Sequence, residues 1–189
     1  MKLNQLPNLI SVLRILLVIP VVYTLANEHY SIALLLFIVA GVSDGVDGFL
    51  ARHYGWQTRL GAILDPIGDK LLLVSVFIVL GWLGYLPVLL VVLVIARDII
   101  IVSGAVLYHF LIEEVPIEPV YISKVNTAVQ LLLVVIVLTR LSGLPFSGLI
   151  PGVSIEVLII SAYVTTVSSG MVYVWQWGRR AVTAGQHKE

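Results

Sequence analysis

Long hydrophobic runs separated by short polar stretches make up most of the chain. Six of these runs are predicted to form helices: Asn8–Ala26, Ser31–Val42, Lys70–Leu83, Pro87–Phe110, Ile122–Thr139 and Glu156–Trp177. A helix of about 20 apolar residues spans the hydrocarbon core of a bilayer. The second and third runs reach that length only if their polar ends are also helical. The pattern therefore predicts an all-α integral membrane protein with six transmembrane helices.

Composition supports the same class of protein. Of the 189 residues, 59% are hydrophobic and only 12% are charged, which is far from the average of soluble domains. We expect residues 1–189 to form a single membrane domain surrounded by membrane lipids. The net charge is zero, so the chain lacks the overall positive field that nucleic-acid binding uses. The absence of cysteine excludes disulfides and thiolate chemistry.

The distribution of Lys and Arg predicts the orientation of the six helices. The connections after the first, third and fifth helices lie on one side of the membrane. They comprise residues 27–30, 81–86 and 141–155 and contain no Lys or Arg. The connections and termini on the other side contain Lys2, Arg52, Arg59, Lys124, Arg179, Arg180 and Lys188. Because short cytoplasmic loops are enriched in Lys and Arg, both termini are expected to be cytoplasmic. The expected location is a bacterial cytoplasmic membrane.

Four of the five aspartates of the chain stand in one window between the second and third hydrophobic runs. Asp44 and Asp47 are three residues apart, and Asp65 and Asp69 are four apart, so each pair lies on one helix face. Gly55 lies midway and allows a short turn on the cytoplasmic side. The helical rise of about 1.5 Å per residue places both pairs at a similar depth, near the inner membrane surface. Buried carboxylates in a membrane span are usually functional.

Carboxylate oxygens favour hard divalent cations, so the window predicts a site for Mg²⁺ or Mn²⁺, with room for two ions. Two adjacent ions can clamp the oxygens of a phosphate during in-line displacement. Small residues at Gly48 and Ala51 would let a ligand approach the helix, and Arg52 and Arg59 offer donors for phosphate. These features indicate a diphosphate substrate. A cation or proton transporter is the alternative from a different class.

Glycines in the neighbourhood have a simpler interpretation. Gly41 and Gly68 are expected to serve helix packing, the commonest role of small residues in membrane helices.

The aspartates also belong to a longer pattern, DxxDGxxAR followed after eight residues by GxxxDxxxD. Its fixed positions are Asp44, Asp47, Gly48, Ala51, Arg52, Gly61, Asp65 and Asp69. The pattern resembles the signature of the CDP-alcohol phosphatidyltransferase family, whose members have six spans and are typically homodimers. The resemblance implies that an acceptor hydroxyl attacks the β-phosphate of CDP-diacylglycerol and that CMP leaves. A prenyl-diphosphate transferase with paired aspartates is a third possibility, but it gives no reason for Gly48, Ala51 and Arg52.

The resemblance also implies roles for individual residues. Asp44, Asp47 and Asp65 would hold the metal ions, and Asp69 would both contact a metal and act as the general base. Residues expected to bind CDP-diacylglycerol are Asn8, Gly48, Ala51, Arg52, Thr58 and Gly61. Arg14, deeper in the first helix, is a weaker candidate for contacting a phosphate.

Two downstream segments bear on the acceptor. The Arg97-Asp98 pair and the segment 122–131 resemble those of family members that form cardiolipin from phosphatidylglycerol. Members that form phosphatidylglycerophosphate from glycerol 3-phosphate usually have Glu in place of Asp98 and Lys in place of Asn126. Phosphatidylglycerol is therefore the expected acceptor, and glycerol 3-phosphate is the alternative. The candidate acceptor-binding residues are Arg14, Arg97, Asp98, Lys124 and Asn126. Arg97 and Asp98 could instead pair with neighbouring groups inside the bundle, and Asn126 and Gln130, one turn apart, could link helices. Lys124 could serve as an interfacial anchor.

Overall fold

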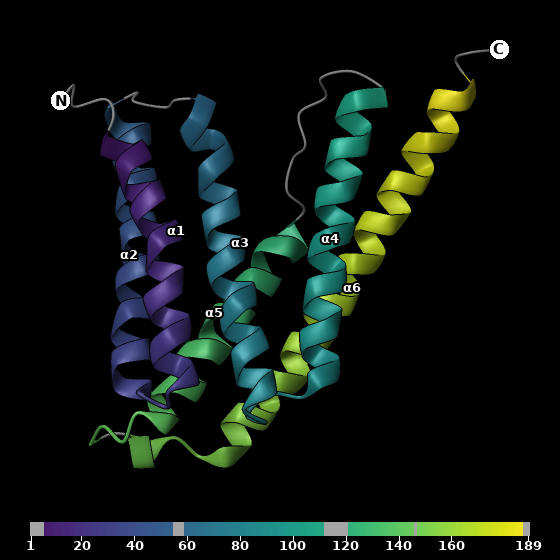
Figure 1. The fold of residues 1–189 in the computed structure, drawn as a ribbon. Helices are drawn as coiled ribbons and strands as arrows, with labels where there is room; N and C mark the ends of the chain where they lie inside the picture. The colour runs from purple at the N-terminus through teal and green to yellow at the C-terminus, as the bar shows by residue number, and fades with distance from the viewer. Residues whose placement is uncertain (1–5, 55–58, 112–120, 146, 187–189) are drawn as a thin grey trace. The chain divides into compact units, whose positions relative to one another are not determined.

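The computed structural model describes residues 6–54, 59–111, 121–145 and 147–186. In order along the chain, the elements are α1 (Leu6–Ala26), α2 (Tyr30–Tyr54), α3 (Arg59–Trp82), α4 (Val88–Leu111), α5 (Tyr121–Leu141), the short 3-10 helix η2 (Ser147–Leu149) and α6 (Gly152–Gln186) (Figure 1). The prediction of an all-α fold with six long helices is confirmed for these residues. Within the described residues, two helical stretches are long and apolar enough to cross a membrane: Tyr121–Leu141 and Gly152–Gln176.

The helices are longer than their apolar runs. α2 continues to Tyr54 and α3 begins at Arg59, so the aspartate window is helical on both sides of its turn, as the lengths of the two runs required. α6 extends to Gln186, beyond the predicted end at Trp177. The predicted span Glu156–Trp177 therefore lies within a longer helix. Residues such as Arg179 are good helix formers, so a helix can continue past its apolar part.

α1 and α3 end in the same kind of turn. Glu28 follows α1 at φ 62°, and Gly84 follows α3 at φ 81°. In each turn the next N–H bonds to a carbonyl five residues earlier, at 2.8 Å from His29 and 2.9 Å from Tyr85. This is the Schellman arrangement, which usually contains glycine at the left-handed position. The turn ends α1 sharply, so that α2 can begin at Tyr30.

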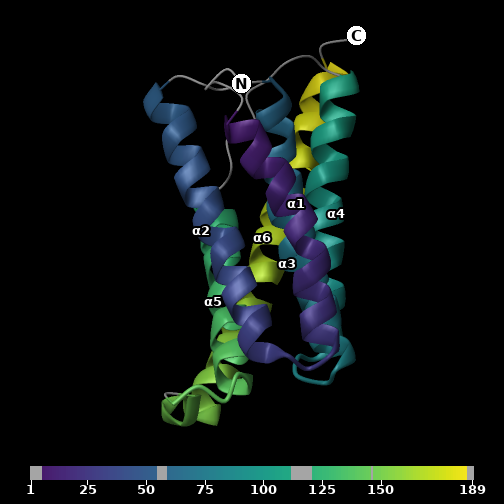
Figure 2. The ribbon, with the colours of Figure 1, turned by 60° about the vertical axis from the view of Figure 1, so that its left-hand side comes forward.

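The helices group into two compact units: Met1–Leu86 with Val134–Gly152, and Pro87–Leu133 with Val153–Glu189. We call them unit 1 and unit 2. In unit 1, α1 packs against both α2 and α3, whereas α2 and α3 make few contacts with each other (Figures 1 and 2). The buried core of unit 1 contains Val21, Leu25, Phe37, Val76, Phe77 and Leu80. α1 is therefore the central helix of the part that carries the aspartate window. That residues 1–189 form a single domain stays a prediction.

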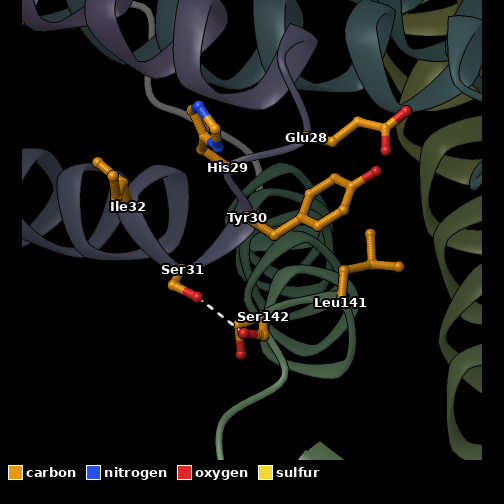
Figure 3. Close-up of a pocket in the computed structure, with 7 residues that line it drawn as sticks. All are labelled: Glu28, His29, Tyr30, Ser31, Ile32, Leu141 and Ser142. Atoms are coloured by element: carbon orange, nitrogen blue, oxygen red, sulfur yellow. Dashed lines mark hydrogen bonds between the residues drawn. The ribbon is translucent and has the colours of Figure 1, made fainter.

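A pocket of about 270 Å³ lies in unit 1, where the turn before α2 meets the end of α5 (Figure 3). The Ser31 hydroxyl donates a 2.7 Å hydrogen bond to the Ser142 carbonyl across it (Figure 3). The Tyr30 hydroxyl, 2.9 Å from that of Tyr85, has a raised pKa because of burial, this hydrogen bond and the nearby Glu28 carboxylate. Neither of the two window aspartates with described side chains, Asp44 and Asp69, lines the pocket.

Unit 2 combines apolar packing with buried polar side chains. Its core includes Leu90, Val94, Leu133 and Ala162. Side chains on α4, α5 and α6 that are also buried are Arg97, Asp98, Asn126, Gln130, Thr166 and Ser169. Because buried polar groups are costly unless they are hydrogen-bonded, this set identifies unit 2 as the second place to look for function.

Candidate active site

Arg14 on α1 joins α2 and α3 through two of the predicted metal ligands. Its Nη1 lies 2.6 Å from Oδ1 of Asp44 on α2 and donates a 2.6 Å hydrogen bond to Oδ1 of Asp69 on α3. The Arg14 side chain is 1% exposed, whereas those of Asp44 and Asp69 are 39% and 49% exposed. One buried nitrogen therefore holds two carboxylates that remain accessible to a solute.

The three-residue arrangement follows from the charges. A buried guanidinium is tolerated when it is paired, and Arg14 is paired with carboxylates from both neighbouring helices. Both Oδ1 atoms lie 2.6 Å from the same Arg14 nitrogen, so the distance between them is at most twice that length. Like charges at that separation repel, and the positive charge of Arg14 offsets the repulsion. The structure thus brings Asp44 and Asp69 together, at the common depth expected for them.

Gly68 on α3 faces the Arg14 side chain of α1. A Cβ at this glycine would lie 3.4 Å from Cγ1 of Ile15 and 3.7 Å from Cδ of Arg14. A bare backbone at Gly68 thus lets α1 and the Arg14 stem lie close to α3, as expected from its helix-packing interpretation. At Gly41 a Cβ would meet no described atom within 4 Å, so the packing interpretation of this glycine stays a prediction.

The described side chains supply two of the carboxylates that a divalent cation would use, and no group of three or more possible metal ligands occurs among them. Asp44 and Asp69 provide two half-exposed carboxylates at one place, and oxygen donors are what Mg²⁺ and Mn²⁺ prefer. Asp47 lies three residues after Asp44 on α2, and Asp65 four residues before Asp69 on α3. Residues at these spacings share a helix face, although the side chains of Asp47 and Asp65 lie outside the described residues.

The predicted nucleotide-binding residues fall largely outside the described side chains. Thr58 lies in the short segment between α2 and α3 that the structure does not describe. The others are placed only by their helices: Asn8 on α1, Gly48, Ala51 and Arg52 on α2, and Gly61 on α3. Their contacts with a nucleotide therefore stay predictions.

In unit 2, Arg97 connects three helices through its guanidinium. Nη1 donates to Oδ1 of Asp98 at 2.6 Å. Nη2 donates to the hydroxyls of Ser123 on α5 and of Ser169 on α6, the latter at 2.9 Å, and Nε reaches Ser169 at 3.2 Å. The Arg97 guanidinium also lies 5.9 Å from the ring centroid of Tyr173, within range of a cation–π interaction. The positive charge of Arg97 is thus balanced by Asp98 within unit 2.

The two remaining acceptor candidates differ in their surroundings. Asn126 is 0% exposed, and its Oδ1 accepts hydrogen bonds from Thr165 and Thr166 of α6, both at 2.9 Å. Lys124 is exposed. Asn126 therefore links α5 to α6, in agreement with the helix-linking interpretation, while the exposure of Lys124 is compatible with an interfacial anchor.

Sequence reasoning missed the hydroxyl residues of unit 2: Ser123, Thr165, Thr166 and Ser169. A weak signal was present, because Thr166, Ser169 and Tyr173 are spaced by three and four residues and share one face of α6. Ser and Thr are common in membrane helices, where they also bond to their own backbone, so this spacing alone did not distinguish them.

The comparison with known proteins agrees with the sequence signature. The profile of the CDP-alcohol phosphatidyltransferase family, a class of CMP-forming transferases, matches residues 4–175, a range that includes parts of both units. The chain belongs to the CDP-alcohol phosphatidyltransferase family.

Individual relatives carry two kinds of name. The chain is 32% identical to the CMP-forming cardiolipin synthase of Rattus norvegicus and 31% identical to that of Homo sapiens. Each alignment covers 94% of this chain and 62% of the relative, so the chain spans about three fifths of their length. It is also 34% identical to a probable phosphatidylglycerophosphate synthase of Mycobacterium tuberculosis (strain ATCC 25618 / H37Rv), over 92% of this chain and 81% of the relative.

Proposed function

We propose that the chain is an integral membrane enzyme of phospholipid biosynthesis that transfers phosphatidyl from CDP-diacylglycerol to a glycerol-type acceptor. Phosphatidylglycerol is the proposed acceptor, and the products are cardiolipin and CMP. The observation that carries the proposal is the meeting of Asp44 and Asp69 on Arg14, which gathers two carboxylates of the family signature at one accessible place.

In the proposed transfer, the acceptor hydroxyl lies within hydrogen-bond reach of the Asp69 carboxylate, which accepts its proton. The hydroxyl oxygen forms a bond to the β-phosphorus, which carries the diacylglycerol. The bond from this phosphorus to the CMP oxygen breaks, and CMP leaves with the electron pair. Arg14 holds Asp69 in place through the 2.6 Å hydrogen bond and leaves about half of its side chain exposed to the acceptor.

We further propose that Asp44, Asp47, Asp65 and Asp69 hold two Mg²⁺ or Mn²⁺ ions. When bound, the ions would stabilise the charge of the diphosphate and of the departing CMP as Lewis acids. Asn8, Gly48, Ala51, Arg52, Thr58 and Gly61 are the proposed CDP-diacylglycerol-binding residues. The small residues Gly48, Ala51 and Gly61 and the Arg52 guanidinium suit the close approach of a phosphate.

The acceptor is proposed to bind near Arg97, Asp98, Lys124 and Asn126, with Arg14 as a further candidate. Asp98 balances the charge of Arg97, and Asn126 adds no charge of its own. Such a site suits the single charge of a phosphodiester better than the larger charge of glycerol 3-phosphate. The names of the rat and human relatives support phosphatidylglycerol, and that of the mycobacterial relative supports glycerol 3-phosphate.

The acceptor proposal is tested with purified protein, CDP-diacylglycerol and Mn²⁺ or Mg²⁺. Each acceptor is added in turn, and CMP and the lipid product are measured. We expect CMP and cardiolipin to appear with phosphatidylglycerol, and neither to form when the metal is chelated. Reaction with glycerol 3-phosphate alone would overturn the cardiolipin proposal and leave the family chemistry intact. Ion flux across vesicles without CMP release would instead favour the transporter.

We also propose six membrane spans with both termini and the aspartate window on the cytoplasmic side of a bacterial cytoplasmic membrane. Large apolar side chains exposed along α1, α2, α4 and α6, such as Ile19, Leu35, Val92 and Val164, are suited to contact lipid. A homodimer is proposed from the family resemblance.

Cysteine labelling tests this topology, because the chain has no cysteine of its own. Glu28 and His53 are both exposed. Glu28 lies in the turn before α2 and His53 near the end of α2, so the two residues are expected on opposite sides of the membrane. We expect a membrane-impermeant maleimide to label Glu28→Cys in intact cells and His53→Cys only after permeabilisation. The unsubstituted protein is the control. Labelling of His53→Cys alone in intact cells would reverse the orientation.

A further inference from the structure

A buried pair of amides lies between α5 and α6 in unit 2. Asn126 and Gln130 are one helical turn apart on α5, and both are 0% exposed. The Gln130 Nε2 donates to the Thr166 hydroxyl at 3.2 Å, and this hydroxyl donates to the Asn126 Oδ1 at 2.9 Å. A single Thr166 oxygen therefore connects the two amides.

The other end of each amide is buried without a partner. Among the described atoms, Nδ2 of Asn126 and Oε1 of Gln130 have no hydrogen bond, and both are inaccessible to solvent. Buried amide groups are nearly always hydrogen-bonded, to protein or to an ordered molecule, because an unmade bond is costly. The two free ends therefore indicate a bound group.

The polarity of that group follows from the Thr166 hydroxyl. In the structure the Thr166 hydroxyl donates its one proton to Asn126 and accepts a hydrogen bond from Gln130. With the amides oriented in this way, the ends that remain are one donor, Nδ2 of Asn126, and one acceptor, Oε1 of Gln130. A group that satisfies both must accept one hydrogen bond and donate one. An ammonium cannot accept and a fully ionised phosphate cannot donate, whereas a neutral hydroxyl does both.

We propose that a neutral hydroxyl group binds between Asn126 and Gln130, accepting from one amide and donating to the other. The hydroxyl belongs either to a resident water or to a polyol, and the polyol source rests on the proposed function. Ser123 on α5 and Ser169 on α6, which bind Arg97, each lie one turn from the amide cluster. The hydroxyl site thus adjoins the residues proposed to bind the acceptor.

The direct test is an experimental structure of the full chain at a resolution that shows ordered water, determined without polyol and again with glycerol. We expect a density peak within hydrogen-bond distance of both free amide ends. A compact peak that is the same in both structures identifies water, and one replaced by extended density in glycerol identifies a polyol hydroxyl. The absence of a peak in both structures would overturn the proposal.

A second test uses thermal unfolding of Gln130→Met, which removes one amide but keeps the side chain long and flexible. We expect its midpoint to fall by roughly 2–4 °C or more, because the hydroxyl and Thr166 each lose a partner. Thr127→Val is the matched control, since the Thr127 hydroxyl on the same helix bonds only the Ser123 carbonyl in the described structure. Equal midpoints for the two variants would contradict the proposal. Neither measurement requires turnover, so failure of the acceptor assay leaves this site standing.

Discussion

The variant Asp69→Asn is expected to lose CMP release by about 10²–10⁴-fold while it still binds CDP-diacylglycerol. An amide cannot accept the proton of the acceptor hydroxyl, so the proposed base is lost. The amide oxygen can still accept the hydrogen bond that Arg14 donates to Oδ1 at 2.6 Å, so the helix arrangement should be retained. The measurements are CMP release under single-turnover conditions and binding of CDP-diacylglycerol by titration calorimetry.

Glu156→Gln is the control for Asp69→Asn, because Glu156 is an exposed carboxylate on α6, in the other unit. It should release CMP at the rate of the unsubstituted protein. Near-normal turnover in Asp69→Asn would remove this residue from the base role. Loss of CDP-diacylglycerol binding together with turnover would instead mean that Asp69 acts mainly by holding the metals.

Removal of Arg14 is expected to have the largest effect on stability. In Arg14→Gln the carboxylates of Asp44 and Asp69 remain close together with no positive charge between them. Breaking a fully buried ion pair costs about 3–5 kcal/mol. Because these aspartates are 39% and 49% exposed, solvent screens the repulsion and we expect about 1–3 kcal/mol. Thermal unfolding in detergent measures the loss.

Three comparisons sharpen the Arg14 experiment. Arg14→Lys should lie between Arg14→Gln and the unsubstituted protein, because a single nitrogen contacts both carboxylates and an ammonium could occupy its place. Mn²⁺ should stabilise Arg14→Gln more than the unsubstituted protein, since the ion supplies the missing positive charge.

Arg140→Gln is the matched control, because Arg140 is exposed and its Nη1 bonds the Ile150 carbonyl. An Arg14→Gln protein as stable as this control would show that the ion pairs contribute nothing.

The helices and the position of the aspartates could be predicted from local sequence. Six hydrophobic runs, two of them extended by their polar ends, predicted six helices, and the helical rise predicted that Asp44 and Asp69 lie at one depth. The family signature was recognisable because its eight positions have fixed spacing within 26 residues. The end of α6 was not predictable in this way, since hydropathy marks the end of the apolar part and not of the helix.

Contacts between helices could not be predicted in the same way. Arg14 is 55 residues from Asp69, and its sequence neighbours are apolar, so its pairing with both aspartates depends on how α1 packs between α2 and α3. The same holds for the distinction between Gly41 and Gly68, which are both glycines in apolar helices. Among the described atoms, a Cβ at Gly68 would contact α1, whereas one at Gly41 would contact nothing.

Sequence alone thus determined the all-helical class, through its hydrophobic runs, and indicated the family, through the resemblance of its motif with fixed spacing. It also singled out four aspartates as the proposed site, because their spacing can be read along one chain. The tertiary structure decided that Arg14 bridges Asp44 and Asp69, and that Asn126 and Gln130 leave a donor and an acceptor buried beside α6. The physical reason is that burial and charge pairing are properties of packed neighbours, and residues far apart along the chain become neighbours only when the helices pack.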